Sequence, residues 1–271
     1  MKILFCGDVV GRSGREAIAT HVPDLRKKLK LDFVIANGEN AAHGFGLTEK
    51  TAAELFSAGV DVITGGNHSW DKPDIIPHMN SDQRLLRPAN FPGTAPGRGA
   101  QVFTDGAGRK LKVVNLMTRL FMELLDDPFT ALEQHLTPAE PKKSGFDALI
   151  VDVHGEATSE KMALGHLADG RATLVVGTHT HIPTADAFIL NKGTAYQTDA
   201  GMCGDYDSVI GMQKEASIGN FLRKLPRERM KPAEGEATFC GVFVESDPAT
   251  GLAIRVAPVR CGGRLSAALP A

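Results

Sequence analysis

The chain reads VDVITGGNHSWD from Val60 to Asp71. Its apolar first part predicts a buried strand, and its two glycines predict an abrupt turn where that strand ends. Asn67 and His68 therefore lie at the tip of a strand. An amide oxygen can bind a metal ion, and an imidazole beside it can donate a proton. Metal-assisted hydrolysis uses both groups. The alternative is a turn without a catalytic role. A metal site is favoured only if other predicted strands are also followed by polar side chains.

Size and composition limit the classes of protein. The 271 residues suffice for a large α/β core. The net charge of −2 predicts no tight non-specific binding to nucleic acid, although a small anionic ligand at a local positive site stays open. The cysteines are scattered, without a Cys-x-x-Cys pair, and predict a reducing compartment. The apolar run at the N-terminus is too short for a signal peptide or a membrane span. We therefore expect a cytoplasmic protein outside the membrane, and the sequence leaves a homo-oligomer open.

Further apolar runs are also followed by polar side chains. They are Lys2–Cys6 before Asp8, Phe33–Ala36 before Glu39 and Asn40, Ala148–Val153 before His154, and Thr173–Val176 before His179 and His181. Predicted strands alternate with predicted helices in the first part of the chain. This order favours parallel pairing, with the loops gathered at the carboxyl ends of the strands. We therefore expect these polar side chains to converge.

The converging set predicts a metal centre. It contains carboxylates, amide oxygens and imidazoles but no thiolate, and such ligands fit manganese, iron or zinc better than a structural cysteine zinc site. The candidate ligands are also more numerous than one metal ion needs. Two metal ions about 3.5 to 4 Å apart would account for the surplus and would clamp an in-line attack on phosphorus.

Local signals predict where the first helices begin. Ser13 and Glu16 have the spacing of a capping box, and Pro23 should kink or split the helix behind them. Thr48 can cap a second helix over residues 49–58. No linker composition forces a division of the chain into domains.

Five sequence blocks resemble a known family. The blocks are Gly7-Asp8, Gly38-Glu39-Asn40, Gly66-Asn67-His68, His154 and Gly177-Thr178-His179-Thr180-His181. In this order they resemble the calcineurin-like metallophosphoesterases. That superfamily usually has Asp-x-His in the first block, where this chain has Asp8-Val9-Val10, and Asp in the second, where it has Glu39. These departures, with Asn40 and the stretch Gln197–Met202, resemble the YmdB-like bacterial subfamily over nearly the whole chain.

The resemblance implies an α/β fold, a four-layer αββα sandwich of two mixed β-sheets, with residues 1–271 as a single metallophosphoesterase domain. It also implies an enzyme, a metal-dependent phosphoric diester hydrolase. The substrates would be cyclic nucleotides, 2′,3′-cyclic monophosphates especially, with 3′,5′-cyclic ones left open. A metal-bridging hydroxide would attack phosphorus while His68 donates a proton to the leaving ribose oxygen.

The resemblance further implies a ligand set for two divalent or trivalent metal ions, iron or manganese first and zinc as an alternative. One ion would be held by Asp8, Glu39, Asn40 and His181, and the other by Glu39 as the bridge, Asn67, His154 and His179. Because Val10 stands where the superfamily has a histidine, Asn40 is the substitute.

Each of these residues has a structural alternative. Asp8 could cap the loop before the first helix, and Glu39 or Asn40 could satisfy backbone amides there. His179 and His181 could be hydrogen-bonded histidines under a hairpin, but two imidazoles after a buried strand, with further candidate ligands elsewhere, favour a metal site.

Neighbouring polar residues are assigned less directly. Asp71 precedes Lys72-Pro73 and is expected to cap a helix rather than to act as a catalytic acid. Glu156 and Thr180 would either orient imidazoles or lie on the surface. Residues 200–236 are a candidate cover for the site.

Two other functions stay open. A phosphomonoesterase would use the same centre, and turnover on a diester against a monoester separates the two. A protein of a different class would bind RNA-processing partners and show little turnover, with the metal site as a relic. The full ligand set, with a non-ligating His68 beside Asn67, favours the enzyme.

Overall fold

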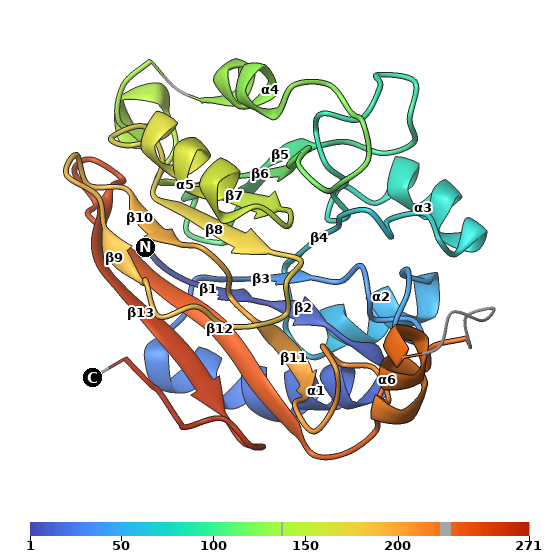
Figure 1. Cartoon of the computed structure of the whole chain (residues 1–271). Coiled ribbons are helices and arrows are strands. Elements are labelled where there is room, and N and C mark those ends of the chain that lie inside the picture. The colour runs from blue at the N-terminus through green and yellow to red at the C-terminus, as the bar shows by residue number, and fades with distance from the viewer. Residues whose placement is uncertain (137, 223–228, 271) are drawn as a thin grey trace.

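The computed structural model describes residues 1–136, 138–222 and 229–270. Two β-sheets lie face to face, and helices cover the outer face of each (Figure 1). One apolar core fills the space between the sheets, and a further core lies between each sheet and its helices. The predicted fold class, a four-layer αββα sandwich of two mixed sheets, is therefore confirmed.

The first sheet has seven strands. They are, in spatial order, β2 (Asp8–Val9), β11 (Met202–Asp205), β12 (Ala237–Ser246), β1 (Lys2–Cys6), β3 (Phe33–Asn37) and β4 (Val62–Thr64), with β13 (Ala253–Cys261) also paired to β12. β1, β3 and β4 are parallel, whereas β12 is antiparallel to β1, β11 and β13. The loops that follow β1, β3 and β4 therefore leave the sheet at the same edge.

The second sheet has six strands. They are, in spatial order, β5 (Ala100–Thr104), β6 (Lys110–Met117), β7 (Ala148–His154), β8 (Leu174–Thr178), β10 (Ala195–Gln197) and β9 (Phe188–Ile189). β6, β7, β8 and β10 are parallel, and antiparallel strands lie at both edges. The polar ends of β7 and β8 therefore also lie side by side.

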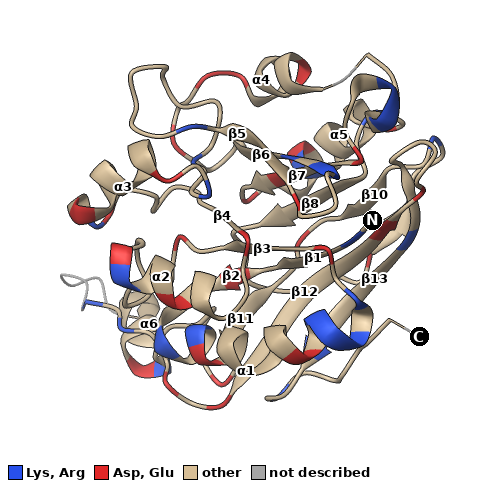
Figure 2. Ribbon diagram, turned by 180° about the vertical axis from the view of Figure 1, so that it is seen from behind, with Lys and Arg blue, Asp and Glu red and all other residues tan. Residues whose placement is uncertain are grey.

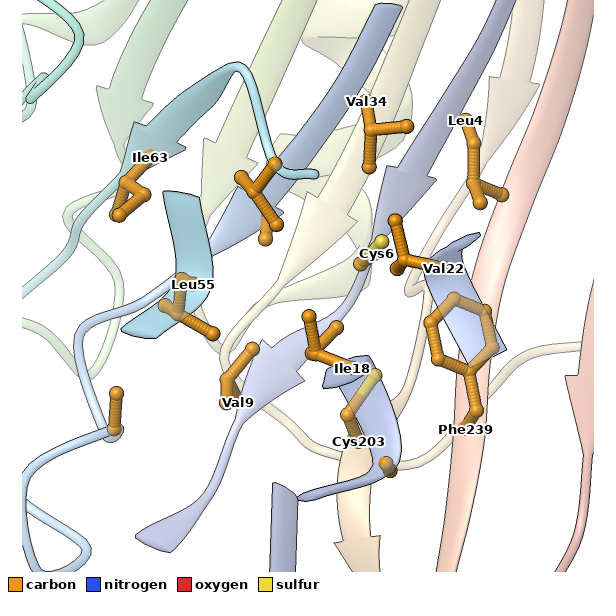
Figure 3. Close-up of a cluster of buried hydrophobic side chains, with 14 of the residues drawn as sticks. Leu4, Cys6, Val9, Ile18, Val22, Val34, Leu55, Ile63, Cys203 and Phe239 are labelled. Atoms are coloured by element: carbon orange, nitrogen blue, oxygen red, sulfur yellow. The ribbon is translucent and has the colours of Figure 1, made fainter. Parts of the chain in front are cut away.

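The central strands β1, β3, β7 and β8 are buried on both faces, because successive side chains point alternately into two different cores. Ile3 and Phe5 of β1 point into the core between the sheets, where they join Ile150 of β7. Leu4 and Cys6 point the other way, towards the helices, as Figure 3 shows. A strand that is apolar on both faces reads as a continuous apolar run, which is the pattern that the sequence has.

Helices form the outer layers. They are α1 (Gly11–Leu29) and α2 (Glu49–Ser57) on the first sheet, α4 (Pro128–His135) and α5 (Thr158–Leu167) on the second, the short α3 (Ile76–Ser81) and α6 (Lys214–Leu222), and 3-10 turns at Pro73–Ile75 and Pro141–Ser144. Lys and Arg are interspersed with Asp and Glu along these outer helices (Figure 2). None of the described helices is long and apolar enough to cross a membrane.

The predicted capping box of α1 is wrong, and so is a split of this helix at Pro23. The residue before its first turn is Val10, which makes no side-chain cap, and Ser13 instead donates to the carbonyl of Ala233 at 3.1 Å. α1 is also not split at Pro23, which lies on its exposed side, and the kink expected there stays a prediction. The second helix agrees with its prediction, because the Thr48 side chain accepts a hydrogen bond at the start of α2.

Candidate metal centre

Strand ends from both sheets meet at one edge of the sandwich. The first sheet contributes Asp8 of β2, Glu39 and Asn40 after β3, and Asn67 and His68 after β4, and the second contributes His154 of β7 and His179 and His181 after β8. Direct contacts join the two sheets here, since the His179 backbone N–H donates to Oδ2 of Asp8 at 3.1 Å. The structure thus brings the predicted site residues together, while their role as metal ligands stays a prediction.

Three side chains converge on one nitrogen of His154. Its Nε2 lies 3.0 Å from Oδ1 of Asn67, 3.1 Å from Oε1 of Glu39 and 3.1 Å from Nδ1 of His179. Two ring nitrogens that face each other at this distance need a proton or a cation between them. The ligand atoms of Glu39, His154 and His179 all lie within 4.8 Å of one another, so one metal ion could bind all three. We call Glu39, Asn67, His154 and His179 the tight group.

The other predicted ligands are less closely paired. Nε2 of His181 lies 3.8 Å from Oδ1 of Asp8, and that buried oxygen has no hydrogen-bond partner. Oδ1 of Asn40 is likewise buried without a partner, although its amide nitrogen donates to the carbonyl of Gly44 at 3.1 Å. A buried acceptor without a partner costs about 1–3 kcal/mol. An unpartnered carboxylate oxygen beside an imidazole fits a bound cation, and Asn40 lines the same cavity as His181, so we call Asp8, Asn40 and His181 the open group.

Hydrogen bonds set which nitrogen each histidine offers. The Thr178 hydroxyl donates to Oδ1 of Asp152 at 2.7 Å, so Nδ1 of His154, 2.9 Å from the same hydroxyl, must be the donor of the pair. Nδ1 of His181 lies 2.8 Å from the carbonyl oxygen of Ile210, which can only accept. In a neutral ring Nε2 then carries the lone pair, and in both histidines this atom faces the predicted ligands.

Buried charges shift the pKa values at the centre. Burial acts to raise the pKa of Glu39, but the charge and hydrogen bond of His154 outweigh it and lower this pKa to about 2. Burial acts to lower the pKa of His154, but Glu39 and Asp8 raise it to about 9. Burial and the neighbouring His154 lower the pKa of His179 to about 3. Burial raises the pKa of Asp8 to about 6, against the opposing charges of His181 and His154. The ion pair of His154 with Glu39 is short, at 3.1 Å, whereas the imidazoles of His181 and His154 lie 3.8 Å and 4.0 Å from Oδ1 of Asp8.

His68 stands beside the tight group without joining it. Its backbone N–H donates to Oε2 of Glu39 at 3.0 Å, and its ring packs edge-on against Phe45 at 5.1 Å between centroids. Its Nδ1 lies 2.8 Å from Oδ2 of Asp71. The prediction that Asp71 caps a helix is wrong, since the following 3-10 turn has Lys72 at its cap position and no side-chain cap bond. Asp71 instead fixes the ring of His68.

The backbone of the centre adopts unusual conformations. His179 and His181 have φ values of 96° and 66°, and Ile210, which bonds His181, has 47°. Non-glycine residues rarely adopt positive φ, and such strain persists only where the surroundings determine it. Gly66 is required for a different reason, because a Cβ there would overlap Oε2 of Glu39 and the ring of His154.

A cavity of about 480 Å³ opens over both groups. Its polar lining includes Glu39, Asn40, His68, Glu156, His179, Thr180 and His181. Its apolar wall consists of Phe45, Val209, Ile210, Met212, Phe221 and Met230. Residues 200–236, expected to cover the site, supply most of this wall, and residues 223–228 lie outside the described part of the chain. The volume is in the range of pockets that bind small molecules.

Several supporting residues were missed in the sequence. Asp152, Thr178 and the Ile210 carbonyl act on the histidines, but nothing in their spacing reveals it. Thr180 makes no direct hydrogen bond to an imidazole and instead donates to Asp199 from its N–H at 3.1 Å and its hydroxyl at 2.8 Å. The sequence does contain a signal for the contact of Asp71 with His68, because side chains three residues apart in a turn can face each other.

Known proteins resemble the chain over almost all of its length. A model of the YmdB-like protein family matches residues 4–259. A 2′,3′-cyclic-nucleotide 2′-phosphodiesterase of Bacillus subtilis (strain 168) is 48% identical over 256 residues, or 94% of this chain and 95% of that protein. Among solved structures, a Thermus thermophilus protein has a TM-score of 0.89 and 42% identity, covering 97% of this chain and 100% of that one. A phosphatase of Mycoplasma pneumoniae has a TM-score of 0.88 and 37% identity, covering 97% and 93%.

Proposed function

The chain belongs to the YmdB-like family, and from this premise we propose that it is a metal-dependent phosphodiesterase that hydrolyses small cyclic nucleotides. 2′,3′-Cyclic nucleotides are the first candidates, because the Bacillus subtilis relative is named for them. The observation that carries the proposal is the convergence of a carboxylate, an amide and an imidazole on Nε2 of His154, at the floor of a cavity.

Two metal ions are assigned to this centre, one to the tight group and one to the open group, with Glu39 shared between them. The fit rests on the unpartnered buried oxygens of Asp8 and Asn40, and on Nε2 of His154 and of His181, which would offer a lone pair to a metal ion when the ring is neutral. When bound, ions of this kind polarise a phosphoryl group and lower the pKa of water. Iron or manganese is the first choice and zinc the alternative, since the ligands are oxygens and imidazoles.

His68 is assigned the proton transfer. Because Asp71 occupies its Nδ1, Nε2 is the atom that would deliver a proton to the leaving ribose oxygen, as a water oxygen adds to phosphorus and the bond from phosphorus to the ribose oxygen breaks. Phe45 limits the freedom of the ring from one side. A proton donor held by a carboxylate is pre-organised, and that lowers the cost of reaching the reactive geometry.

The cavity suits a nucleotide in two parts. The polar floor would take the phosphate, and the apolar wall, which includes Phe45, Met212 and Phe221, would take the sugar and base. We further assign the protein to the cytoplasm. All four of its cysteines are free thiols, and a reducing compartment keeps thiols in this state. The assignment of residues 1–271 to a single domain stays a prediction, and a homo-oligomer stays open.

A phosphomonoesterase is the second candidate, and one observation favours it, namely that the structurally similar Mycoplasma pneumoniae protein is described as a phosphatase. The two functions differ in substrate and share the centre.

Turnover decides between them. Purified protein loaded with Mn²⁺ or Fe²⁺ is expected to hydrolyse 2′,3′-cyclic AMP faster than the monoester p-nitrophenyl phosphate, and chelation should abolish both activities. Faster turnover of the monoester would favour the phosphatase. No turnover of any phosphate ester by metal-loaded protein would contradict both proposals.

A further inference from the structure

Lys161 of α5 is a fully buried lysine that the proposed reaction does not use. Its ammonium donates to the carbonyl oxygen of Thr178 at 2.7 Å and to Oδ2 of Asp199 at 2.9 Å. Asp199 is also fully buried, so the two form an ion pair out of contact with water. A buried pair of this kind carries a large desolvation cost and is weak support for stability by itself. Its location therefore needs a different explanation.

The ion pair makes hydrogen bonds to the backbone on both sides of His179. Lys161 bonds the carbonyl of Thr178, which precedes it. Asp199 accepts from the N–H and the hydroxyl of Thr180, which follows it. The second oxygen of Asp199 accepts from the N–H of Gly201 at 2.9 Å, which ties the pair to the chain beyond β10. The four residues from Thr178 to His181 are thus held at two points by one pair of charges.

That segment is where the backbone is strained. Both histidines in it have positive φ, 96° for His179 and 66° for His181. Such conformations cost roughly 1–3 kcal/mol each and persist only when neighbouring contacts enforce them. If the segment relaxed, Nδ1 of His179 would leave the tight group and Nε2 of His181 would leave the open group, because the backbone torsions aim both rings.

We propose that Lys161 and Asp199 are positioning residues that set the metal affinity of the centre by holding His179 and His181 in their strained conformations. The inference rests on the proposed metal-dependent function. Neither residue touches the cavity floor, so their effect reaches the ligands through Thr178 and Thr180. Outer contacts of metal ligands commonly change metal affinity by about 10- to 100-fold.

The test compares Lys161→Met with a matched lysine. Lys112 of β6 is partly buried and donates to the carbonyl of His135 at 2.6 Å, away from the centre, so Lys112→Met also removes a cation and a carbonyl bond. Chelator-treated full-length proteins are titrated with Mn²⁺, and the rise in Tm that Mn²⁺ causes is measured separately. Lys161→Met should raise the apparent Kd for Mn²⁺ by about 10- to 100-fold and shrink the Mn²⁺-induced rise in Tm. Lys112→Met should leave both unchanged, whatever it does to the Tm of the metal-free protein.

A second variant keeps the test decisive if Lys161→Met does not fold. Thr180→Val leaves the ion pair intact and removes only the hydroxyl donor to Asp199. It should raise the apparent Kd for Mn²⁺ by about 2- to 10-fold, the worth of one hydrogen bond. Wild-type Mn²⁺ affinity in Lys161→Met, or in Thr180→Val when the former does not fold, would overturn the inference and leave the proposed function standing. Wild-type protein that binds no Mn²⁺, Fe²⁺ or Zn²⁺ would instead overturn the proposed function, and the inference with it.

Discussion

The tight group and the open group share an edge of the same sandwich, but they are assembled in different ways. In the tight group the ligand atoms already lie 3.0–3.1 Å from Nε2 of His154, and Glu39 has a cationic partner. In the open group Oδ1 of Asp8 and Oδ1 of Asn40 are buried with no partner. The tight group and the open group therefore depend on a bound cation to different degrees. The tight group contains an ion pair between His154 and Glu39 that exists without a metal, whereas the unpartnered oxygens of the open group carry a desolvation cost that a bound cation would remove.

The largest expected effect follows from the one residue that both halves share. Glu39→Gln should lose metal from both groups and lower the turnover of a cyclic nucleotide by about 10⁴-fold or more, since it removes several kcal/mol of transition-state stabilisation. Metal content by mass spectrometry and kcat/KM are the measurements. Glu16→Gln, an exposed change on α1, is the control. Loss of metal from one group only would show that Glu39 is not shared.

The next effect separates chemistry from metal binding. His68→Ala should keep both metal ions, because the contact of residue 68 with Glu39 is made by its backbone N–H, which alanine retains. Turnover should fall by about 10²- to 10⁴-fold, the usual worth of a general acid. His78→Ala, which removes a histidine paired with Glu49 away from the centre, should be fully active. A fully active His68→Ala enzyme would remove His68 from the role of proton donor.

The pH dependence of stability tests the open group. In metal-free protein, burial raises the folded-state pKa of Asp8 from 3.8 to about 6, so the stability that Asp8 contributes is complete below pH 3.8 and is lost as the pH rises through 6. Between pH 4.5 and pH 7 this amounts to about 2 kcal/mol of unfolding free energy. Denaturant unfolding of wild type and Asp8→Asn should differ by this pH-dependent amount, and saturating Mn²⁺ should reverse the wild-type trend. Equal pH dependence in the two metal-free proteins would show that Asp8 carries no such cost.

The smallest effect concerns the support of His68. Asp71→Asn should lower turnover by about tenfold without changing metal content, because the ring is no longer oriented by a carboxylate. Asp74→Asn, an exposed neighbour in the 3-10 turn, should have no effect. If Asp71→Asn lost metal, the separation between His68 and the tight group would be wrong.

The sequence predicts those features of the fold and site that depend on residues close together in the chain. The buried strands were visible because β1, β3, β7 and β8 are apolar on both faces, and the site was visible because polar residues directly follow those strands. Parallel pairing places Glu39 and Asn67 at one edge of the first sheet, and His154 and His179 at one edge of the second. The contact of Asp8 with His179 also needs the two sheets to stack face to face, which strand order within one sheet does not predict.

The misses involve partners that are remote in the chain or that are backbone groups. The hydroxyl of Ser13 has the spacing of a cap but bonds the carbonyl of Ala233, a tertiary contact that overrides the local pattern. His181 is fixed by the carbonyl of Ile210, and a carbonyl has no sequence signature. Lys161 on α5 and Asp199 after β10 are 38 residues apart in the chain and meet because both elements pack on the second sheet.

Anomalous diffraction from crystals grown with Mn²⁺ tests the central claim most directly, because it locates the ions without reference to activity. We predict two peaks about 3.5 to 4 Å apart, one contacting Asn67, His154 and His179 and the other contacting Asp8, Asn40 and His181, with Glu39 touching both. A single peak at the tight group, or peaks that leave Asp8 and His181 without a metal contact, would contradict the two-ion account.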